Sequence, residues 1–396
     1  MSISFVRAAV FSLLLAACLG TTNCGAQTPL TGADQLDRYL PLLANKKVAL
    51  VINQTSRIGD SSLLDVLRSR GINIRTIFVP EHGFRGTADA GAHVASGVDP
   101  LTRIPVTSLY GNHKKPSAEE LRNVDIVIYD LQDVGVRFYT YISTLQYVME
   151  ACAANGKEVM VLDRPNPNGF YVDGPVLDTA LRSFVGMQPI PVVYGMTAGE
   201  YAKMLIGERW FTGAFRLKLT VVPCSGYDHR MMYSLPVSPS PNLKTDEAVQ
   251  LYPALCLFEG TVVSVGRGTE KPFQHWGHPD FSPKIGYSFT PTSTVGASKP
   301  LYEGRRCYGM AMANNSTEAL SYMNGKMRLE PLLQAYEWYG RKPGFFNSFF
   351  EKLAGTNELR RQVEAGMSED AIRKTWKPGL DRFRKIRKRY LLYRDF

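Results

Sequence analysis

Four segments of the chain share one pattern, in which a run of apolar residues suited to a buried strand ends abruptly in polar residues. They are VALVINQ (48–54), IRTIFVPEHG (74–83), DIVIYDLQDVG (125–135) and EVMVLDRPNPNG (158–169). Near-continuous apolar runs are typical of parallel strands that are covered on both faces. Ligands of open parallel sheets bind beyond the carboxyl ends of the strands, where these polar residues would converge. The pattern therefore predicts an active site along one edge of a parallel sheet.

The segments between these strands have the features of helices. Residues 61–70 are followed by Gly71 and residues 139–155 by Gly156, and glycine commonly terminates helices. Alternating strands and helices predict an α/β fold built on a Rossmann-like parallel sheet. The first turn, NQTSRIGD, lacks the Gly-x-Gly-x-x-Gly fingerprint, and the sequence contains no P-loop. The sheet is therefore expected to bind something other than a nucleotide, and no cofactor is expected.

Three regions are expected along the 396 residues. Residues 1–26 predict a signal peptide, because Arg7 precedes an apolar run that small residues follow. A Rossmann-like catalytic domain is expected at 37–187, and a Pro-rich stretch (187–195) separates it from a smaller α+β domain at 188–396 that closes the cleft. Two processing sites fit the signal peptide, a lipobox at Cys18 and ordinary cleavage before Gln27. The protein is therefore expected to be exported and periplasmic, with a lipid anchor if Cys18 is processed.

The formal net charge of +10 is concentrated near the C-terminus. Ten Lys and Arg residues lie within residues 371–396, against two Asp residues. Apolar residues recur there at helical spacing, which predicts an amphipathic helix packed on the domain with its cations in solvent. Because the protein is expected to be exported, no nucleic-acid partner is expected. Contact with a membrane is expected only through the N-terminal anchor.

Glu81 is the strongest candidate for a catalytic group. It follows Pro80 at a strand end and precedes Gly83, so a tight turn would hold it at the mouth of the cleft, beside apolar neighbours. Apolar surroundings favour the protonated form of a carboxyl group, which is the form that a general acid requires. His82 is expected to make an orienting hydrogen bond or to contact the ligand.

Asp130 and Asp133 are the other catalytic candidates. Each would serve as a second carboxylate or bind hydroxyl groups of the substrate, and the alternative is that both only cap the following helix. Arg137 would neutralise an anionic group of the ligand. The three residues follow the same apolar run, so we expect them at one edge of the sheet.

The second domain offers its own candidates. Segment 255–269 (LCLFEGTVVSVGRGT) predicts a pair of strands, from which Glu259 and Arg267 would face the cleft. Ligand contact and an interdomain ion pair are the two interpretations of these residues. His275 and His278 in HWGH have a spacing that metal ligands use, but no convincing third ligand accompanies them, so no metal is expected.

Six motifs, in order over nearly the whole mature chain, together resemble the NamZ-type exo-β-N-acetylmuramidases. They are PEHGFRG (80–86), YDLQDVGVRFYTY (129–141), DRPNPNG (163–169), GMTAGE (195–200), SPSPN (238–242) and FEGTVVSVGRGT (258–269). The resemblance implies a glycoside hydrolase that removes terminal N-acetylmuramic acid (MurNAc) from the non-reducing end of peptidoglycan fragments. It also implies an active site in the cleft between a Rossmann-like domain and a smaller C-terminal domain, with the catalytic glutamate at Glu81.

The resemblance also implies roles for the other candidate residues in binding MurNAc. Asp130 or Asp133 would be the second carboxylate or a sugar ligand, and Arg137 or Arg267 would bind the lactyl carboxylate of MurNAc. A periplasmic protein that binds muropeptides or amino sugars without turnover is the alternative, and a metal-dependent hydrolase of wall peptides is a third reading. The candidate substrate-binding residues are Asn53, His82, Arg85, Arg137, Tyr139, Asp163, Arg164, Asn166, Asn242, Glu259 and Arg267.

Overall fold

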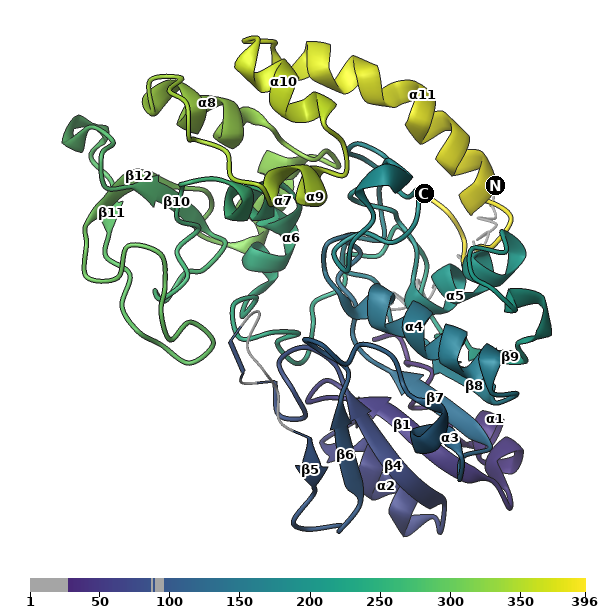
Figure 1. Cartoon of the computed structure of the whole chain (residues 1–396). Helices are drawn as coiled ribbons and strands as arrows, with labels where there is room; N and C mark the ends of the chain where they lie inside the picture. Colours follow the sequence, from purple (N-terminus) through teal and green to yellow (C-terminus); the bar gives the residue numbers. More distant parts are fainter. Residues whose placement is uncertain (1–27, 87, 90–95) are drawn as a thin grey trace, which may run out of the picture.

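The largest element of the protein is a seven-stranded sheet (Figure 1). The computed structural model describes residues 28–86, 88–89 and 96–396, so the expected signal peptide and Cys18 lie outside the described residues. The strands of the sheet are β1 (Lys47–Ile52), β4 (Asn73–Val79), β5 (Gly97–Val98), β6 (Pro105–Ser108), β7 (Ile126–Asp130), β8 (Glu158–Leu162) and β9 (Leu219–Val222).

The strand order is β5-β6-β4-β1-β7-β8-β9, and every pair except β5 with β6 is parallel. The chain runs from β1 to β4 on one side and later places β7 on the other side, so the order reverses beside β1. Such a switch point opens a crevice at the carboxyl ends of the strands. The mostly parallel sheet confirms the predicted α/β fold.

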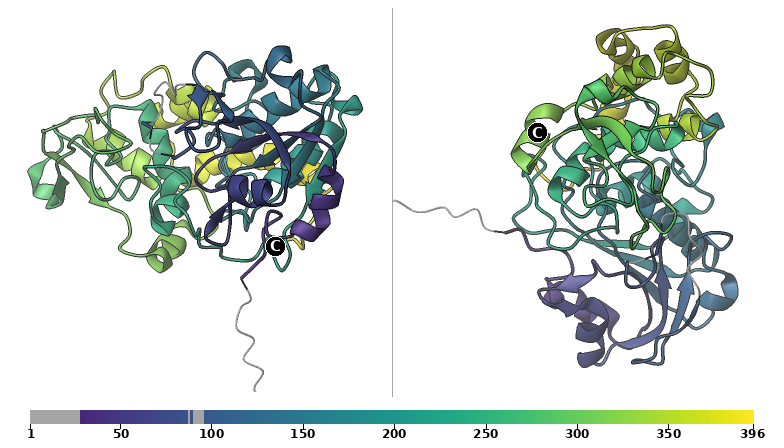
Figure 2. Two further views of the ribbon diagram at one scale, coloured as in Figure 1. Left: turned by 90° about the horizontal axis from the view of Figure 1, so that it is seen from below. Right: turned by 90° about the vertical axis from the view of Figure 1, so that its left-hand side faces the viewer.

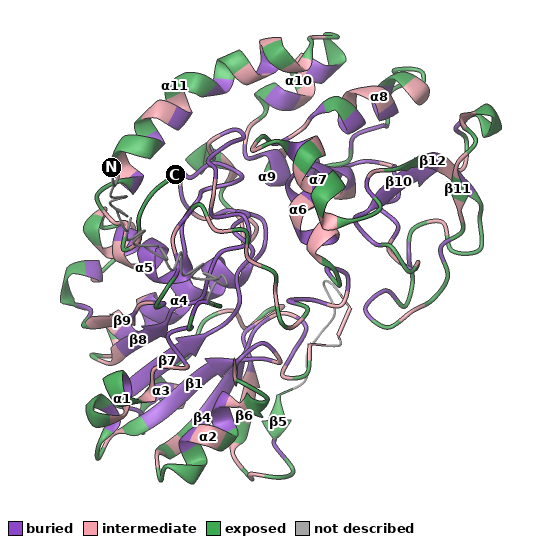
Figure 3. Cartoon of the chain, turned by 180° about the vertical axis from the view of Figure 1, so that it is seen from behind, coloured by how far each residue is buried: buried purple, intermediate pink, exposed green. Residues whose placement is uncertain are grey.

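Both faces of the sheet are covered, as the continuous apolar strands require. Leu50 of β1 packs with helix α2 on one face, whereas Val51 belongs to the core that contains α4 and α5 on the other. Strand β7 is therefore buried throughout and β1 is buried except at Lys47, while the outer sides of the helices are exposed (Figure 3). The helices of this part are α1 (Leu36–Tyr39), η1 (Leu40–Leu43), α2 (Leu63–Ser69), α3 (Ala118–Leu121), α4 (Tyr141–Ala154), η2 (Thr179–Leu181), α5 (Ala198–Gly207) and η3 (Ala214–Arg216), and a small hairpin joins β2 (Arg57–Ile58) to β3 (Ser61–Ser62).

The boundary expected at residue 187 is wrong, because the sheet continues beyond it. Strand β9 pairs in parallel with β8, and α5 packs against both strands. The Pro-rich stretch after residue 187 is not a linker, since Val193 is buried and bridges both Val136 and Asp173. Proline and apolar residues in this stretch therefore build a buried connection within the sheet domain.

A smaller C-terminal region lies at one end of the sheet domain (Figure 2). Segment 255–269 does not form the expected strand pair, because helix α6 continues directly into the turn η4 and the chain then makes only isolated bridges at Thr261 and Ser264. The elements of this region are α6 (Asp246–Leu255), η4 (Cys256–Gly260), β10 (His275–His278), η5 (Pro283–Ile285), β11 (Ser288–Phe289), β12 (Cys307–Ala311), α7 (Ser316–Met323), α8 (Glu330–Trp338), α9 (Phe350–Ala354), α10 (Glu358–Glu364) and α11 (Glu369–Arg387).

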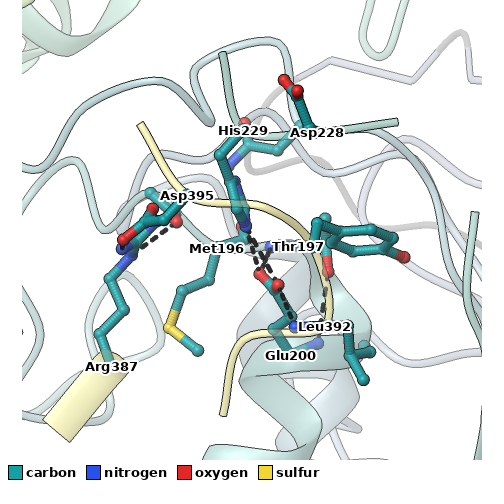
Figure 4. A network of polar contacts seen from close by, with 12 residues as sticks. Met196, Thr197, Glu200, Asp228, His229, Arg387, Leu392 and Asp395 are labelled. Atoms are coloured by element: carbon teal, nitrogen blue, oxygen red, sulfur yellow. Dashed lines mark hydrogen bonds and ion pairs between the residues drawn. The ribbon is translucent and has the colours of Figure 1, made fainter. Parts of the chain in front are cut away.

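Helix α11 returns the chain to the sheet domain, where the last residues are fastened by polar contacts (Figure 4). Glu200, a buried residue of α5, accepts hydrogen bonds from the backbone N–H of Thr197 (3.0 Å) and of Leu392 (2.7 Å). His229 Nε2 lies 3.0 Å from both oxygens of the same carboxylate. One buried carboxylate thus joins the start of α5, the segment around His229 and the C-terminal segment. No helix in the described parts of the chain is long and apolar enough to cross a membrane.

Candidate active site

A cavity of about 580 Å³ separates the carboxyl edge of the sheet from the C-terminal region. Loops that follow β4, β6 and β7 line one side, and η4, α9 and their neighbours line the other. Its lining comprises Glu81, His82, Tyr110, Gly111, Lys114, Phe138, Tyr139, Thr140, Tyr141, Ser183, Phe184, Val185, Ser240, Leu243, Tyr252, Cys256, Glu259, Arg267, Phe273, Phe349, Lys352 and Leu353.

Glu81 reaches this cavity from a tight turn at the end of β4. The N–H of Gly83 donates to the carbonyl of Pro80 (3.1 Å), and His82 lies in the left-handed region at φ 71°. That conformation is costly for a residue with a side chain, so the surroundings must hold it. Thr140, at the start of α4, donates from Oγ1 to Glu81 Oε2 at 2.8 Å. The turn and this hydrogen bond fix the carboxyl group at the cavity wall.

His82 supports the turn and also lines the cavity. Its ring Nδ1 lies 2.7 Å from the carbonyl of Ala88, and burial lowers the pKa of the imidazole. A neutral imidazole that donates from Nδ1 fits this geometry. The structure therefore gives His82 the orienting hydrogen bond that was one of its two expected roles, at a position where it also faces the ligand space.

Glu259 and Arg267 form an ion pair within the C-terminal region, on the opposite side of the cavity. Arg267 Nε lies 2.6 Å from Glu259 Oε1, and the guanidinium carbon is 4.9 Å from the centre of the Phe273 ring. Both side chains keep about a quarter of their surface exposed, 25% for Glu259 and 22% for Arg267. The pair joins two residues of one region, so it is not the interdomain pair considered as an alternative, and it leaves both groups accessible to a ligand.

Asp130 lies below the cavity and does not line it. It is fully buried, and Arg164 binds it in a bidentate manner, with Nε 2.5 Å from Oδ1 and Nη2 3.0 Å from Oδ2. A buried pair of this kind satisfies both charges internally. The structure therefore places Asp130 and Arg164 in a scaffold under the active site, away from the substrate contacts expected for them.

Asp133 is also buried and also absent from the cavity lining. Its Oδ2 accepts hydrogen bonds from the hydroxyl of Tyr194 and from the N–H of Gly135, whereas Oδ1 has no partner in the described structure. The start of α4 is formed by Thr140, so neither Asp130 nor Asp133 caps that helix. The capping interpretation is therefore wrong, and the cavity lining gives no support for the catalytic one.

Burial raises the pKa of Asp133 to about 6, which makes a testable prediction. An unfolded aspartate loses its proton near pH 4, so between about pH 4 and pH 6 the folded state binds more protons than the unfolded state. The free energy of unfolding contributed by this group therefore falls as the pH rises through that window. Between pH 4.5 and pH 7.5 we expect the free energy of unfolding of wild type to fall by about 1–2 kcal/mol relative to that of Asp133→Asn. Urea unfolding at both pH values measures this difference.

The same comparison with Asp60→Asn, an exposed aspartate, serves as the control. If the difference between wild type and Asp133→Asn did not change with pH, the buried carboxyl would have an ordinary affinity for protons and the prediction would be wrong.

The DRPNPNG motif builds the same scaffold. Asp163 accepts hydrogen bonds from Thr197 Oγ1 (2.6 Å) and from the hydroxyl of Tyr393 (2.6 Å), and Asn166 Nδ2 donates to the carbonyl of Met196 (2.8 Å). Burial raises the pKa of Asp163 to about 6. Neither residue lines the cavity. The motif thus ties the end of β8 to α5 and to the C-terminal segment, so Asp163 and Asn166 lie in this support and not at the cavity wall.

Arg137 is likewise away from the cavity lining, so the structure does not support its expected role as a partner of an anionic ligand. Its side chain is fully buried, and its guanidinium donates to four backbone carbonyls. Gly355 leaves room for it, because a Cβ atom there would come within 2.4 Å of Nη2. The four acceptors are the carbonyls of Pro175 (2.8 Å), Ile190 (2.9 Å), Leu353 (2.9 Å) and Ala354 (2.8 Å). Arg137 therefore fastens α9 to the sheet domain.

The other predicted residues divide between the cavity and its supports. Tyr139 lines the cavity, and its hydroxyl donates to the carbonyl of Pro239 at 2.8 Å. Asn53 does not line the cavity, but its Nδ2 donates at 2.9 Å to the hydroxyl of Tyr141, which does. Asn242 is buried and donates to the carbonyl of Gly296 (2.8 Å), and Arg85 is exposed outside the lining.

Sequence reasoning missed several residues that line the cavity. Lys114 comes from the loop after β6, and Lys352 from α9, and no motif marks either of them. Tyr110 belongs to the loop after β6, a strand that the sequence pattern did not indicate, and Tyr252 belongs to α6. Thr140 could have been predicted, because it lies inside the YDLQDVGVRFYTY motif. Among the described residues, no group of three His, Cys, Asp or Glu side chains is placed to hold a metal ion.

The strand-end loops of a parallel sheet, facing a second region across a cavity with carboxylates, cations and aromatic rings, define an α/β protein with an enzyme-like cleft. Family models of the exo-beta-N-acetylmuramidase NamZ match the chain, the N-terminal one over residues 48–247 and the C-terminal one over residues 250–393. The chain therefore belongs to the NamZ family of exo-β-N-acetylmuramidases, as its motifs predicted. The division between the two matches follows β9, in agreement with the extent of the sheet.

Relatives and solved structures agree with this assignment. The peptidoglycan beta-N-acetylmuramidase NamZ of Bacillus subtilis (strain 168) is 38% identical over 388 residues, which cover 92% of this chain and 91% of the relative. Two DUF1343 family proteins of Bacteroides fragilis NCTC 9343 have similar crystal structures. One has a TM-score of 0.86 at 44% identity and covers 93% of this chain and 99% of its own. The other has a TM-score of 0.76 at 28% identity, with 92% and 99% covered.

Proposed function

We propose that the protein is an exo-acting glycoside hydrolase that releases terminal β-N-acetylmuramic acid from the non-reducing end of peptidoglycan fragments. The observation that carries the proposal is the position of Glu81, which a tight turn and Thr140 hold at the wall of a cavity large enough for a sugar. Membership of the NamZ family supports the same reaction. Release of MurNAc by the purified protein tests it, and binding without release would indicate the muropeptide-binding protein instead.

In this reaction Glu81 is the general acid. Cleavage of a β-glycosidic bond needs a protonated carboxyl group that gives its proton to the departing oxygen, while positive charge develops on the sugar ring. Asp130 and Asp133 are buried outside the cavity lining, so we do not assign them the role of second carboxylate. Glu259 is the other carboxylate of the described lining. The 2-acetamido group of MurNAc is an alternative nucleophile, supplied by the substrate itself. If it attacks the anomeric carbon, a single essential carboxyl group is sufficient.

Arg267 is the proposed partner of the lactyl carboxylate that distinguishes MurNAc from N-acetylglucosamine. Its ion pair with Glu259 engages Nε, and its side chain remains partly exposed at the cavity. Guanidinium groups bind carboxylates through their forked N–H donors. Glu259 therefore orients the guanidinium, and the lactyl carboxylate binds the N–H donors that remain.

Arg267→Ala is expected to lower kcat/KM for a chromogenic β-N-acetylmuramide about 10–100-fold more than for the matched β-N-acetylglucosaminide, because it removes a charged hydrogen bond to the lactyl group. Steady-state kinetics on both substrates measure this selectivity. Arg122→Ala, which removes an exposed arginine outside the cavity, is the control and should leave both values unchanged. Equal losses on both substrates in Arg267→Ala would refute the assignment.

We also propose that the protein is exported to the periplasm, with a lipid anchor if Cys18 is processed. The N-terminal sequence supports both, because Arg7, an apolar run and small residues follow each other as in a secretory signal. A periplasmic enzyme would meet peptidoglycan fragments directly.

A further inference from the structure

A second hollow, which no part of the proposed reaction uses, lies next to the cavity. This groove has a volume of about 950 Å³ and shares Lys114, Ser183 and Phe184 with the active-site cavity. The outer side of α4 and the segment from Trp210 to Arg216 form its remaining walls. Ligand sites usually have volumes of roughly 300–1,000 Å³, so the groove has room for a ligand of its own.

An aromatic series runs from the cavity into the groove. Tyr110 lines the cavity, Phe184 lines both hollows, and Tyr147 lines the groove. The Tyr110 and Phe184 ring centres are 5.9 Å apart, and the Phe184 and Tyr147 rings are stacked at 6.1 Å with an interplanar angle of 11°. The three aromatic side chains therefore form a continuous path between the two hollows. Aromatic faces of this kind offer apolar surface to the C–H faces of sugar rings.

The groove is strongly cationic. Lys114, Lys115, Arg182 and Arg216 line it, and Glu150 is the acidic residue among its described lining. Glu150 already binds Lys115, with Nζ and Oε2 2.8 Å apart. The other cations therefore face the groove without an acidic partner in its lining, which suits a ligand that carries carboxylates.

A polar group at the junction supports the presence of a ligand. Ser183 lines both hollows, and its Oγ is buried without a hydrogen-bond partner in the described structure. A buried hydroxyl group normally has such a partner. A sugar hydroxyl that passes from the cavity into the groove would provide one.

We propose that this groove binds the saccharide on the leaving-group side of the scissile bond, an amino-sugar chain that carries lactyl carboxylates. The inference rests on the proposed function, because exo cleavage places the terminal sugar in the cavity and the rest of the chain must continue from it. The saccharide packs beside Phe184 and Tyr147, and its carboxylates bind Arg182 and Arg216. A stem peptide would explain the cations, but it would not need an aromatic path that is continuous with the cavity.

The test compares Arg182→Ala/Arg216→Ala with wild type on two substrates. A chromogenic β-N-acetylmuramide fills only the cavity, and its kcat/KM is expected to stay within twofold of wild type. For a peptide-free tetrasaccharide with MurNAc at its non-reducing end, kcat/KM is expected to fall tenfold or more, mainly through KM. Both arginines are exposed, so the variant is expected to fold. Arg122→Ala/Arg361→Ala is the matched control, because these exposed arginines pair only with glutamates of their own helices.

Two outcomes would overturn the proposal. One is unchanged cleavage of the tetrasaccharide by the variant, and the other is a loss that appears only when the substrate carries stem peptides. If wild type cleaved neither substrate, the proposed function would fail, and calorimetric binding of the same tetrasaccharide would then decide about the groove. Tenfold weaker binding to the variant would support it, and equal binding would overturn it.

Discussion

Glu81→Gln is expected to lower kcat/KM for a peptide-free tetrasaccharide with MurNAc at its non-reducing end by about 10²–10⁴-fold, which is the usual contribution of a general acid. Glutamine has the shape of glutamic acid, and its amide oxygen still accepts the hydrogen bond from Thr140, but it has no proton to give to the departing oxygen. The loss should therefore appear in kcat, while the affinity for the product sugar changes little. Steady-state kinetics and calorimetric titration with MurNAc measure the two quantities.

Glu119→Gln is the matched control for this experiment, because Glu119 is a glutamate of α3 whose side chain is 70% exposed outside the cavity. It should leave kcat and KM unchanged. If Glu81→Gln retained activity within tenfold of wild type, the proton would have to come from another group. Glu259, across the cavity, would then become the first candidate for the acid.

Arg137→Met is expected to lower the free energy of unfolding by about 3–5 kcal/mol, because methionine fills much of the space but leaves four buried carbonyls without their donor. Two of these carbonyls belong to the sheet domain and two to α9, whose residues Lys352 and Leu353 line the cavity. Activity is therefore expected to fall together with stability. Denaturant unfolding and kinetics on the same preparation measure both effects.

Arg361→Met provides the comparison, since this arginine of α10 is 71% exposed and bonded to a glutamate of its own helix. Its free energy of unfolding should change by less than about 1 kcal/mol. A small change in Arg137→Met would show that the buried guanidinium does not hold α9 to the sheet domain. The loss of muramide selectivity without a loss of stability would instead return Arg137 to the substrate-binding role that the sequence suggested.

The strands and the principal acid could be predicted because both depend on local sequence. A continuous apolar run indicates a buried parallel strand wherever it occurs, and β1, β4, β7 and β8 all follow that rule. Glu81 could be predicted as a cavity residue because proline and glycine enforce a turn directly after such a strand. The family motifs pointed to the same residue.

The partners of Glu81 could not be predicted in the same way. Polar residues at strand ends serve two purposes, and the sequence does not separate them, so Asp130 and Asp163 were also predicted at the site although they belong to a buried scaffold. Only the fold shows that arginine and hydroxyl donors already occupy their oxygens. Lys114 and Lys352 were not predicted because they lie in segments without a motif. They come to line the same cavity only when α9 packs against the sheet domain.

The proposed activity is the release of one sugar from one end of a saccharide chain. The most direct measurement is mass spectrometry of the products formed by the purified mature protein from a peptide-free tetrasaccharide with MurNAc at its non-reducing end. We predict free MurNAc and the matching trisaccharide as the first products, and no disaccharide at early times. Disaccharide as the first product, or binding of the tetrasaccharide without any release of MurNAc, would contradict the exo-acting mechanism assigned to this cavity.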